Sequence, residues 1–239
     1  MVSRAALGAL AKACLRATAL VSAIGCAPLA PPPLFARLAG AGRDERGTIT
    51  LTAAVGLGLA GRSGGMGFEL RGRWQAVDDV ALGAGFGAAW GDGDPDETVE
   101  TTRIMGLRIF GVANPGGEDA LALAFGAGFS GTNTGQRSVS LDVGAMTSGT
   151  LWDTVEPSLG LAAAVAIPVD QGRPFGPRDA PELPTTTFYY GGNVGLGIHL
   201  ASTRNVLSGE TGLLFARSIS GQRATALYLA AADAQGVKP

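Results

Sequence analysis

Few side chains in this chain of 239 residues have the chemistry of a catalytic site. Its one histidine, His199, could act as a general base together with an acid such as Glu210 and a nucleophile such as Ser208. These three residues match no hydrolase motif, and a lone histidine is more often a structural side chain than a catalytic one. The sequence therefore predicts no catalytic residues and no enzymatic activity.

Metal and cofactor sites are equally hard to build from these residues. The acidic segment 91–97 resembles the start of an EF-hand calcium loop, but no helices flank it and no glutamate stands at the twelfth position. The glycine-rich segment 83–87 is not followed by a helix, which a nucleotide-binding loop requires. Both cysteines, Cys14 and Cys26, lie near the N-terminus, so with a single histidine we expect no metal site and no cofactor.

The composition argues against several classes of protein. Glycine contributes 38 of the 239 residues, more than twice its usual share of ~7%. Only 16% of the residues are charged, which argues against a disordered chain and is unusual for a freely soluble enzyme. A formal net charge of −2 with no basic cluster predicts that nucleic acid is not a partner.

The first 25 residues have the pattern of a secretory signal peptide. A basic stretch without acidic residues precedes a short, uncharged and mostly apolar stretch. The tetrad 23–26 resembles a bacterial lipobox, which makes Cys26 a candidate for lipidation. The alternative is that residues 5–19 form an amphipathic, alanine-rich helix and that Cys26 is an ordinary thiol.

A proline-rich segment follows the signal. Triple proline at 31–33 favours an extended chain and cannot continue a helix, so residues 26–46 are interpreted as a tether. We expect the folded domain to begin at residue 47.

From residue 47 onward, apolar residues alternate with small or polar ones. Ile49, Leu51 and Val55, for example, alternate with threonine, alanine and glycine. A period of two over many residues indicates β-strands with two unlike faces. Ten segments show this period to differing degrees: 48–59, 66–76, 80–90, 98–113, 121–129, 137–146, 151–167, 188–200, 205–219 and 223–231. If 137–146 is a loop and one further weak segment is dropped, eight strands remain.

The connections between these segments also tend to alternate in length. Counted from the first strand, the odd connections include the two most elaborate ones, 91–97 and 168–185. The even connections include tight turns such as Asp78-Asp79. Transmembrane barrels have short turns at one end and longer loops at the other, so the pattern favours that architecture.

The two strand faces differ in a way that indicates their surroundings. One face carries large apolar residues, and the other carries mainly glycine, alanine, threonine and serine. A narrow barrel in a membrane places small residues in its lumen and large apolar residues against lipid. Trp74 and Trp90 lie near strand ends, where the interfacial aromatic residues of such barrels occur. The expected fold is all-β: a closed antiparallel up-and-down β-barrel of 8–10 strands.

The export signal, the amphipathic strands and the alternating loops resemble the small outer-membrane β-barrel superfamily of Gram-negative bacteria. The transmembrane domain of outer-membrane protein A is a member of that superfamily. The resemblance covers residues 47–231 and implies a location in the outer membrane, with the lipid bilayer as partner and no protein partner identified. Members usually end on a strand with a terminal aromatic residue, whereas here Tyr228 is followed by further residues and 232–239 are expected to form a tail.

In a barrel of this kind, charged residues on the small-residue face point into the lumen. The candidates are Glu69, Arg71, Arg73, Arg108, Asp142, Glu156, His199 and Glu210. Buried charges must pair, so these side chains are expected to form a network that closes the lumen. The alternative is a narrow or gated pore whose selectivity these charges set.

Together these observations predict a non-enzymatic outer-membrane barrel with a structural or interaction role, and a narrow pore is the second interpretation. The competing class is a periplasmic or surface lipoprotein with a soluble, lipocalin-like barrel that binds a hydrophobic ligand. In that barrel the large residues, such as Leu123 and Phe125, would point inward. Its exterior would then be unusually poor in charge, which favours the membrane barrel.

Overall fold

The structure is a computed structural model, and it describes residues 45–60, 63–91, 102–115, 121–149, 151, 154–172, 184–199 and 205–237. The signal peptide, Cys26 and most of the predicted tether lie outside the described residues, as does residue 92 onward in the acidic segment. The described residues contain no helix that is long and apolar enough to cross a membrane.

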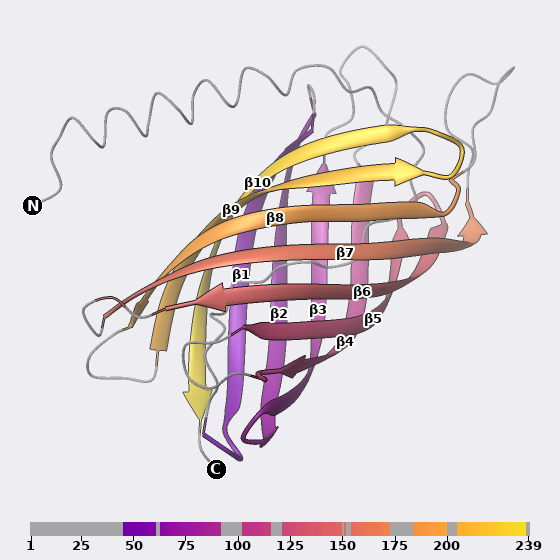
Figure 1. The fold of residues 1–239 in the computed structure, drawn as a ribbon. Helices are drawn as coiled ribbons and strands as arrows, with labels where there is room; N and C mark the ends of the chain where they lie inside the picture. The colour runs from indigo at the N-terminus through magenta and orange to yellow at the C-terminus, as the bar shows by residue number, and fades with distance from the viewer. Residues whose placement is uncertain are drawn as a thin grey trace, which may run out of the picture.

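Ten antiparallel strands form one closed barrel, in which each strand pairs with its neighbours in sequence and the last strand pairs with the first (Figure 1). The strands are β1 (Ile49–Ala60), β2 (Ser63–Val77), β3 (Val80–Gly91), β4 (Thr102–Ala113), β5 (Ala122–Thr132), β6 (Gln136–Ser148), β7 (Val155–Gln171), β8 (Thr187–His199), β9 (Asn205–Ser218) and β10 (Arg223–Val237). The prediction of an all-β, closed, up-and-down barrel is confirmed.

The eight-strand version of that prediction is wrong, because the segment 137–146 is a strand and not a loop. It forms most of β6, whose residues alternate regularly between exposed and buried. Val139, Leu141 and Val143 are exposed, while Ser138, Ser140 and Asp142 between them are buried. A polar face of this kind resembles a loop in sequence, but here it is the face turned into the lumen.

Closure of the barrel depends on the pairing of β1 with β10. Their register runs from Ile49 opposite Val237 to Leu59 opposite Leu227. β10 therefore continues past Ala231, where the barrel domain was expected to end, and includes most of the expected tail. The alternation is hidden there because alanines at 232 and 234 face inward while the polar Asp233 faces outward.

β7 also extends beyond its predicted end. The sequence suggested a loop from Pro168 onward, but the strand continues to Gln171. A register shift between Arg137 and Ser138 of β6 lies directly opposite Pro168. Proline lacks a backbone donor and is tolerated in a sheet at such a bulge, which explains why it does not end the strand.

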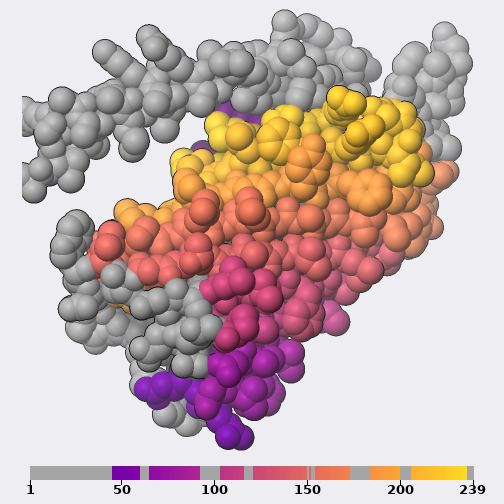
Figure 2. All heavy atoms as spheres, viewed as in Figure 1, coloured from indigo at the N-terminus to yellow at the C-terminus, as the bar shows by residue number. Residues whose placement is uncertain are grey.

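The two faces of the barrel wall have opposite character. Large apolar side chains are exposed along the outside of all ten strands, including Ile109, Leu141 and Leu161, which are 68%, 61% and 64% exposed. The side chains of β7 to β10 cover their part of the wall without a gap in the space-filling view (Figure 2). Leu123 and Phe125 are also exposed, so the inward orientation required by a lipocalin-like barrel is wrong.

Candidate functional site

The charged residues of the lumen are brought together by strand register. Arg71 of β2 lies opposite Gly85 of β3, which in turn lies opposite Arg108 of β4. Asp142 of β6 lies opposite Gly126 of β5. Glycine thus stands between the charged positions on neighbouring strands, and long side chains can extend over it.

Arg108 and Asp142 form a buried, two-pronged ion pair across β5. The Nε of Arg108 donates to Oδ2 of Asp142 at 2.9 Å, and Nη2 of Arg108 donates to Oδ1. Arg108 is 5% exposed and Asp142 is 3% exposed. A Cβ on Gly126 would lie 2.7 Å from both the Arg108 Nε and the Asp142 Oδ2, so the pair depends on glycine at that position.

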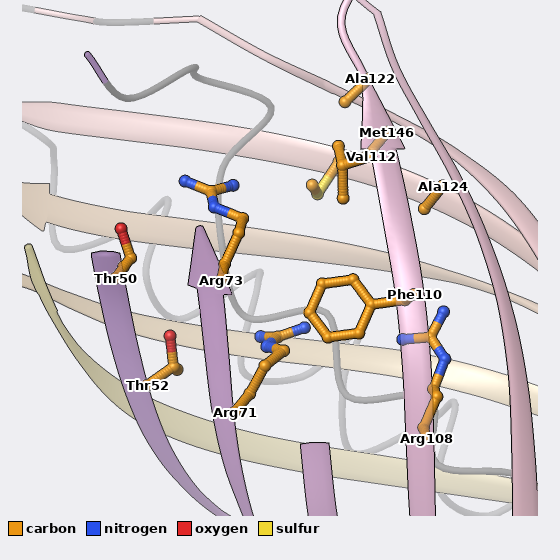
Figure 3. Close-up of a pocket in the computed structure, with 10 residues that line it drawn as sticks. All are labelled: Thr50, Thr52, Arg71, Arg73, Arg108, Phe110, Val112, Ala122, Ala124 and Met146. Carbon is orange, nitrogen blue, oxygen red and sulfur yellow. The ribbon is translucent and has the colours of Figure 1, made fainter. Parts of the chain in front are cut away.

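A buried phenyl ring lies between two arginines beside this ion pair. The ring centre of Phe110 is 5.0 Å from the guanidinium carbon of Arg108 and 5.8 Å from that of Arg71. Both distances fall within the range of cation–π attraction. Figure 3 shows the ring between the two side chains, at the edge of a cavity of about 50 Å³ that Arg73 also lines.

Two further acids complete the group. The Tyr228 hydroxyl donates to Oε1 of Glu210 at 2.6 Å, and Glu210 is 4% exposed. Arg71 interacts electrostatically with both Glu69 and Glu210. We call this group the polar plug: Glu69, Arg71, Arg73, Arg108, Phe110, Asp142 and Glu210. Its three acids and three arginines balance in formal charge.

Glu156 and His199, which the sequence also assigned to the lumen, form a separate pair. The Nε2 of His199 lies 2.8 Å from Oε2 of Glu156, and the histidine side chain is 41% exposed. His199 is the last residue of β8, at the end of the barrel where β1 begins. The structure thus pairs His199 with Glu156 and Glu210 with Tyr228, and not with one another as a catalytic group would require.

The lumen contains a second region that the sequence did not single out. It is a cavity of about 350 Å³ whose lining comes from β1, β2, β3, β4, β7, β8, β9 and β10. Inward positions of β1 and β2 contribute glycine at 56, 58, 65 and 67, so the wall there has no side chains. We call this cavity the apolar chamber, because only Glu69, Asn193 and Tyr228 bring inward polar side chains to it. The glycines at successive inward positions were the sequence feature from which this cavity could have been predicted.

The predicted interfacial aromatic residues lie on the outside of the barrel. Trp74, near the end of β2, is 49% exposed, and Trp90, near the end of β3, is 38% exposed. Because β2 and β3 are antiparallel, the two residues lie toward opposite ends of the barrel.

Among the described residues, no group of three histidines, cysteines or acids could hold a metal ion.

Comparison with known proteins finds likeness only at the level of solved structures. No family model and no curated protein matches the chain. The chain is similar to the translocator domain of the autotransporter NalP from Neisseria meningitidis, at 12% identity over 79% of this chain and 87% of that one, with a TM-score of 0.49.

Two further solved structures are similar over most of their length. They are Neisserial surface protein A, at 11% identity over 80% of this chain and 96% of that one with a TM-score of 0.40, and the KdgM porin in complex with disordered oligogalacturonate, at 12% identity over 77% and 97% with a TM-score of 0.38. Since these TM-scores lie below 0.5, the fold assignment rests on the strand pairing described above.

Proposed function

We propose that this chain is a non-enzymatic outer-membrane β-barrel with a structural or interaction role, whose lumen is closed by the polar plug. The observation that carries the proposal is the exterior of the barrel. Large apolar side chains are exposed on every strand, as would suit a surface in contact with lipid.

The placement of charged residues on the outer face also supports a barrel whose exterior contacts lipid. The outward arginines of the described strands are Arg103, Arg137, Arg217 and Arg223, each within two residues of a strand end and each exposed. All four lie at the end of the barrel opposite the start of β1. One outward charge, Asp233 of β10, lies inside this pattern, where it is paired in register with Ala53 and Leu207 and accepts a hydrogen bond from Gln235. Apart from Asp233, the outward charges lie near strand ends, as a bilayer favours, because charge is costly in hydrocarbon and favourable among head groups.

The polar plug favours a closed barrel over a narrow pore. Arg108 and Asp142 are paired and buried, and the phenyl ring of Phe110 lies between two guanidinium groups. A pore would need charges that remain hydrated along a continuous path. We therefore expect no steady single-channel conductance from the reconstituted protein. The same proposal includes three assignments made from the sequence: an export signal at residues 1–25, a lipidation site at Cys26, and interfacial anchors at Trp74 and Trp90.

Charge placed in the middle of the apolar band tests the membrane orientation. Ile109 and Leu141 are mid-strand, and both lie opposite Ala127. Ile109→Arg and Leu141→Arg should each destabilise the inserted barrel by about 2–4 kcal/mol, the cost of a cation near the bilayer midplane. Ile219→Arg is the matched control, because Ile219 is 67% exposed in the turn between β9 and β10.

The measurement is membrane fractionation followed by electrophoresis with and without boiling. The parent chain and Ile219→Arg should be recovered with the outer membrane and migrate differently when boiled, because a closed barrel keeps its backbone hydrogen bonds in detergent. Recovery of Ile109→Arg and Leu141→Arg at the level of the control, or release of the parent chain as a folded soluble protein, would contradict the proposal.

A further inference from the structure

The apolar chamber has the size and lining of a small-molecule site. Its volume of about 350 Å³ lies within the range of ~300–1,000 Å³ that ligand pockets occupy. The inward-facing residues of its lining are mainly glycine and alanine, and Ile104 and Leu214 are the large aliphatic ones. An apolar cavity of this size would gain free energy by taking up an apolar molecule from water.

Two polar groups at the chamber lack hydrogen-bond partners. Oε2 of Glu69 and Nδ2 of Asn193 are buried and make no hydrogen bond to any described residue. Glu69 and Asn193 are each 6% exposed, and both line the chamber. A buried polar group without a partner costs free energy, so each of these atoms calls for a ligand atom of the opposite kind.

We infer that the apolar chamber binds a small molecule with an unbranched apolar chain and a hydroxyl head group. A carboxylate oxygen accepts a hydrogen bond and an amide nitrogen donates one, and a hydroxyl can serve either atom. At roughly 30 Å³ per heavy atom, the volume of the chamber corresponds to a ligand of about a dozen heavy atoms. The inference concerns the inside of the barrel and goes beyond the proposed function.

The probe for the test is 1-octanol, added to the full chain reconstituted in lipid nanodiscs. Methyl NMR of isoleucine separates binding in the lumen from partition into lipid. Ile104 lines the chamber, whereas Ile109 on the same strand is 68% exposed on the outside. The Ile104 methyl resonance should shift to saturation with 1-octanol while that of Ile109 follows only the lipid.

Two glycine substitutions provide a matched pair of variants. A Cβ on Gly58 would meet only the carbonyl oxygen of Leu227, at 4.0 Å, so Gly58→Phe can extend into the chamber. A Cβ on Gly209 would meet nothing within 4 Å, and Gly209 lies on the outer face of β9 between Leu196 and Ala231. Gly58→Phe should abolish the saturable shift of Ile104, and Gly209→Phe should leave it unchanged.

A second pair of variants tests the head-group contacts. Because the one hydroxyl of 1-octanol can serve either atom, at least one of the variants Asn193→Leu and Glu69→Leu should weaken 1-octanol binding about fivefold, the effect of one hydrogen bond. Neither should weaken binding of 1-chlorooctane, which has the same number of heavy atoms and no donor. Equal affinity of the parent chain and both inserted variants for 1-octanol would contradict the head-group contact.

The outcomes distinguish this inference from the proposed function. Heat-dependent migration on a gel reports whether each variant is an inserted barrel, independently of ligand. An inserted parent chain whose Ile104 and Ile109 resonances respond alike to 1-octanol, or a Gly58→Phe variant that still shows a saturable response, would overturn the inference and leave the membrane barrel intact. Failure of the parent chain to insert would contradict the proposed function instead.

Discussion

The polar plug and the apolar chamber occupy one lumen and share a strand, yet side chains fill the first and leave the second empty. Inward positions of β2 carry Arg73, Arg71 and Glu69 in succession, and the next inward positions are Gly67 and Gly65. The lumen changes from filled to empty at this point. The barrel wall is continuous through both regions, so the inward residue type alone decides whether the space is occupied.

The two regions also differ in how they treat polar groups. In the plug, Arg108 and Asp142 satisfy each other through two hydrogen bonds. At the chamber, Asn193 and Glu69, which is the plug residue that borders the chamber, keep one unpartnered atom each. Satisfied buried charge makes a region rigid, whereas unsatisfied polar atoms beside empty apolar space prepare a region for a ligand. The comparison therefore predicts that the plug is sensitive to small changes and that the chamber tolerates them.

The largest effect is expected from breaking the buried ion pair. Arg108→Leu should lower the free energy of unfolding by about 3–5 kcal/mol, because it leaves the Asp142 carboxylate buried without a partner. Urea unfolding of the reconstituted barrel measures this change. The double variant Arg108→Leu/Asp142→Leu should recover much of the loss, since it removes both charges. Equal stability of the single and double variants would mean that the pair is not what holds the plug together.

A smaller change in stability is expected when glycine is replaced by alanine, and the same substitution in both regions compares them directly. Gly126→Ala adds a Cβ that would lie 2.7 Å from Arg108 and Asp142, so it should cost about 1–3 kcal/mol by overpacking. Gly58→Ala adds the same group to the chamber, with 4.0 Å to the nearest atom, and should stabilise the strand by ~0.5–1 kcal/mol. The same urea titration reports both values. If both variants lost equal stability, the contrast between plug and chamber would not hold.

The smallest effect is expected at the rim. His199→Ala removes the pair with Glu156, but the histidine side chain is 41% exposed, so the loss should be about 1 kcal/mol or less. Added salt should reduce the difference between variant and parent, because exposed pairs are screened. If His199→Ala lowered the free energy of unfolding as much as Arg108→Leu, the pair of His199 and Glu156 would be as important for stability as the plug, and the comparison would fail.

Much of the fold could be predicted from the sequence because a period of two encodes both strand type and facing. Leu141 and Asp142 illustrate this: one is exposed outside and the other buried inside, as alternation requires. Strand ends were harder to predict. Pro168 was expected to end the strand, and only the bulge beside it, where Val169 of β7 has no partner on β6, explains why β7 continues.

The contacts within the candidate site were harder to predict from the sequence, because pairing of side chains in the lumen depends on the register between strands that are not adjacent. The charged residues could be assigned to one face, but the sequence does not specify that Arg108 reaches Asp142 over Gly126. The chamber was missed for a related reason. Inward glycines such as Gly58 could accommodate large neighbours, as Gly126 does, or leave space, and only the strands facing them across the lumen decide which.

The pairing of Ile49 with Val237 has a consequence for how the chain acquires its structure. These partners are separated by nearly the whole folded part of the sequence, so the ring cannot close until β10 has been synthesised, and the high contact order favours slow folding. Until closure, β1 and β10 each present an unpaired edge bearing Leu51 and Leu229, which would recruit other chains. We expect removal of a single terminal strand to cause aggregation and not a smaller barrel, and if the chain is exported as proposed, we expect the unfolded protein to depend on a holding factor until the ring closes.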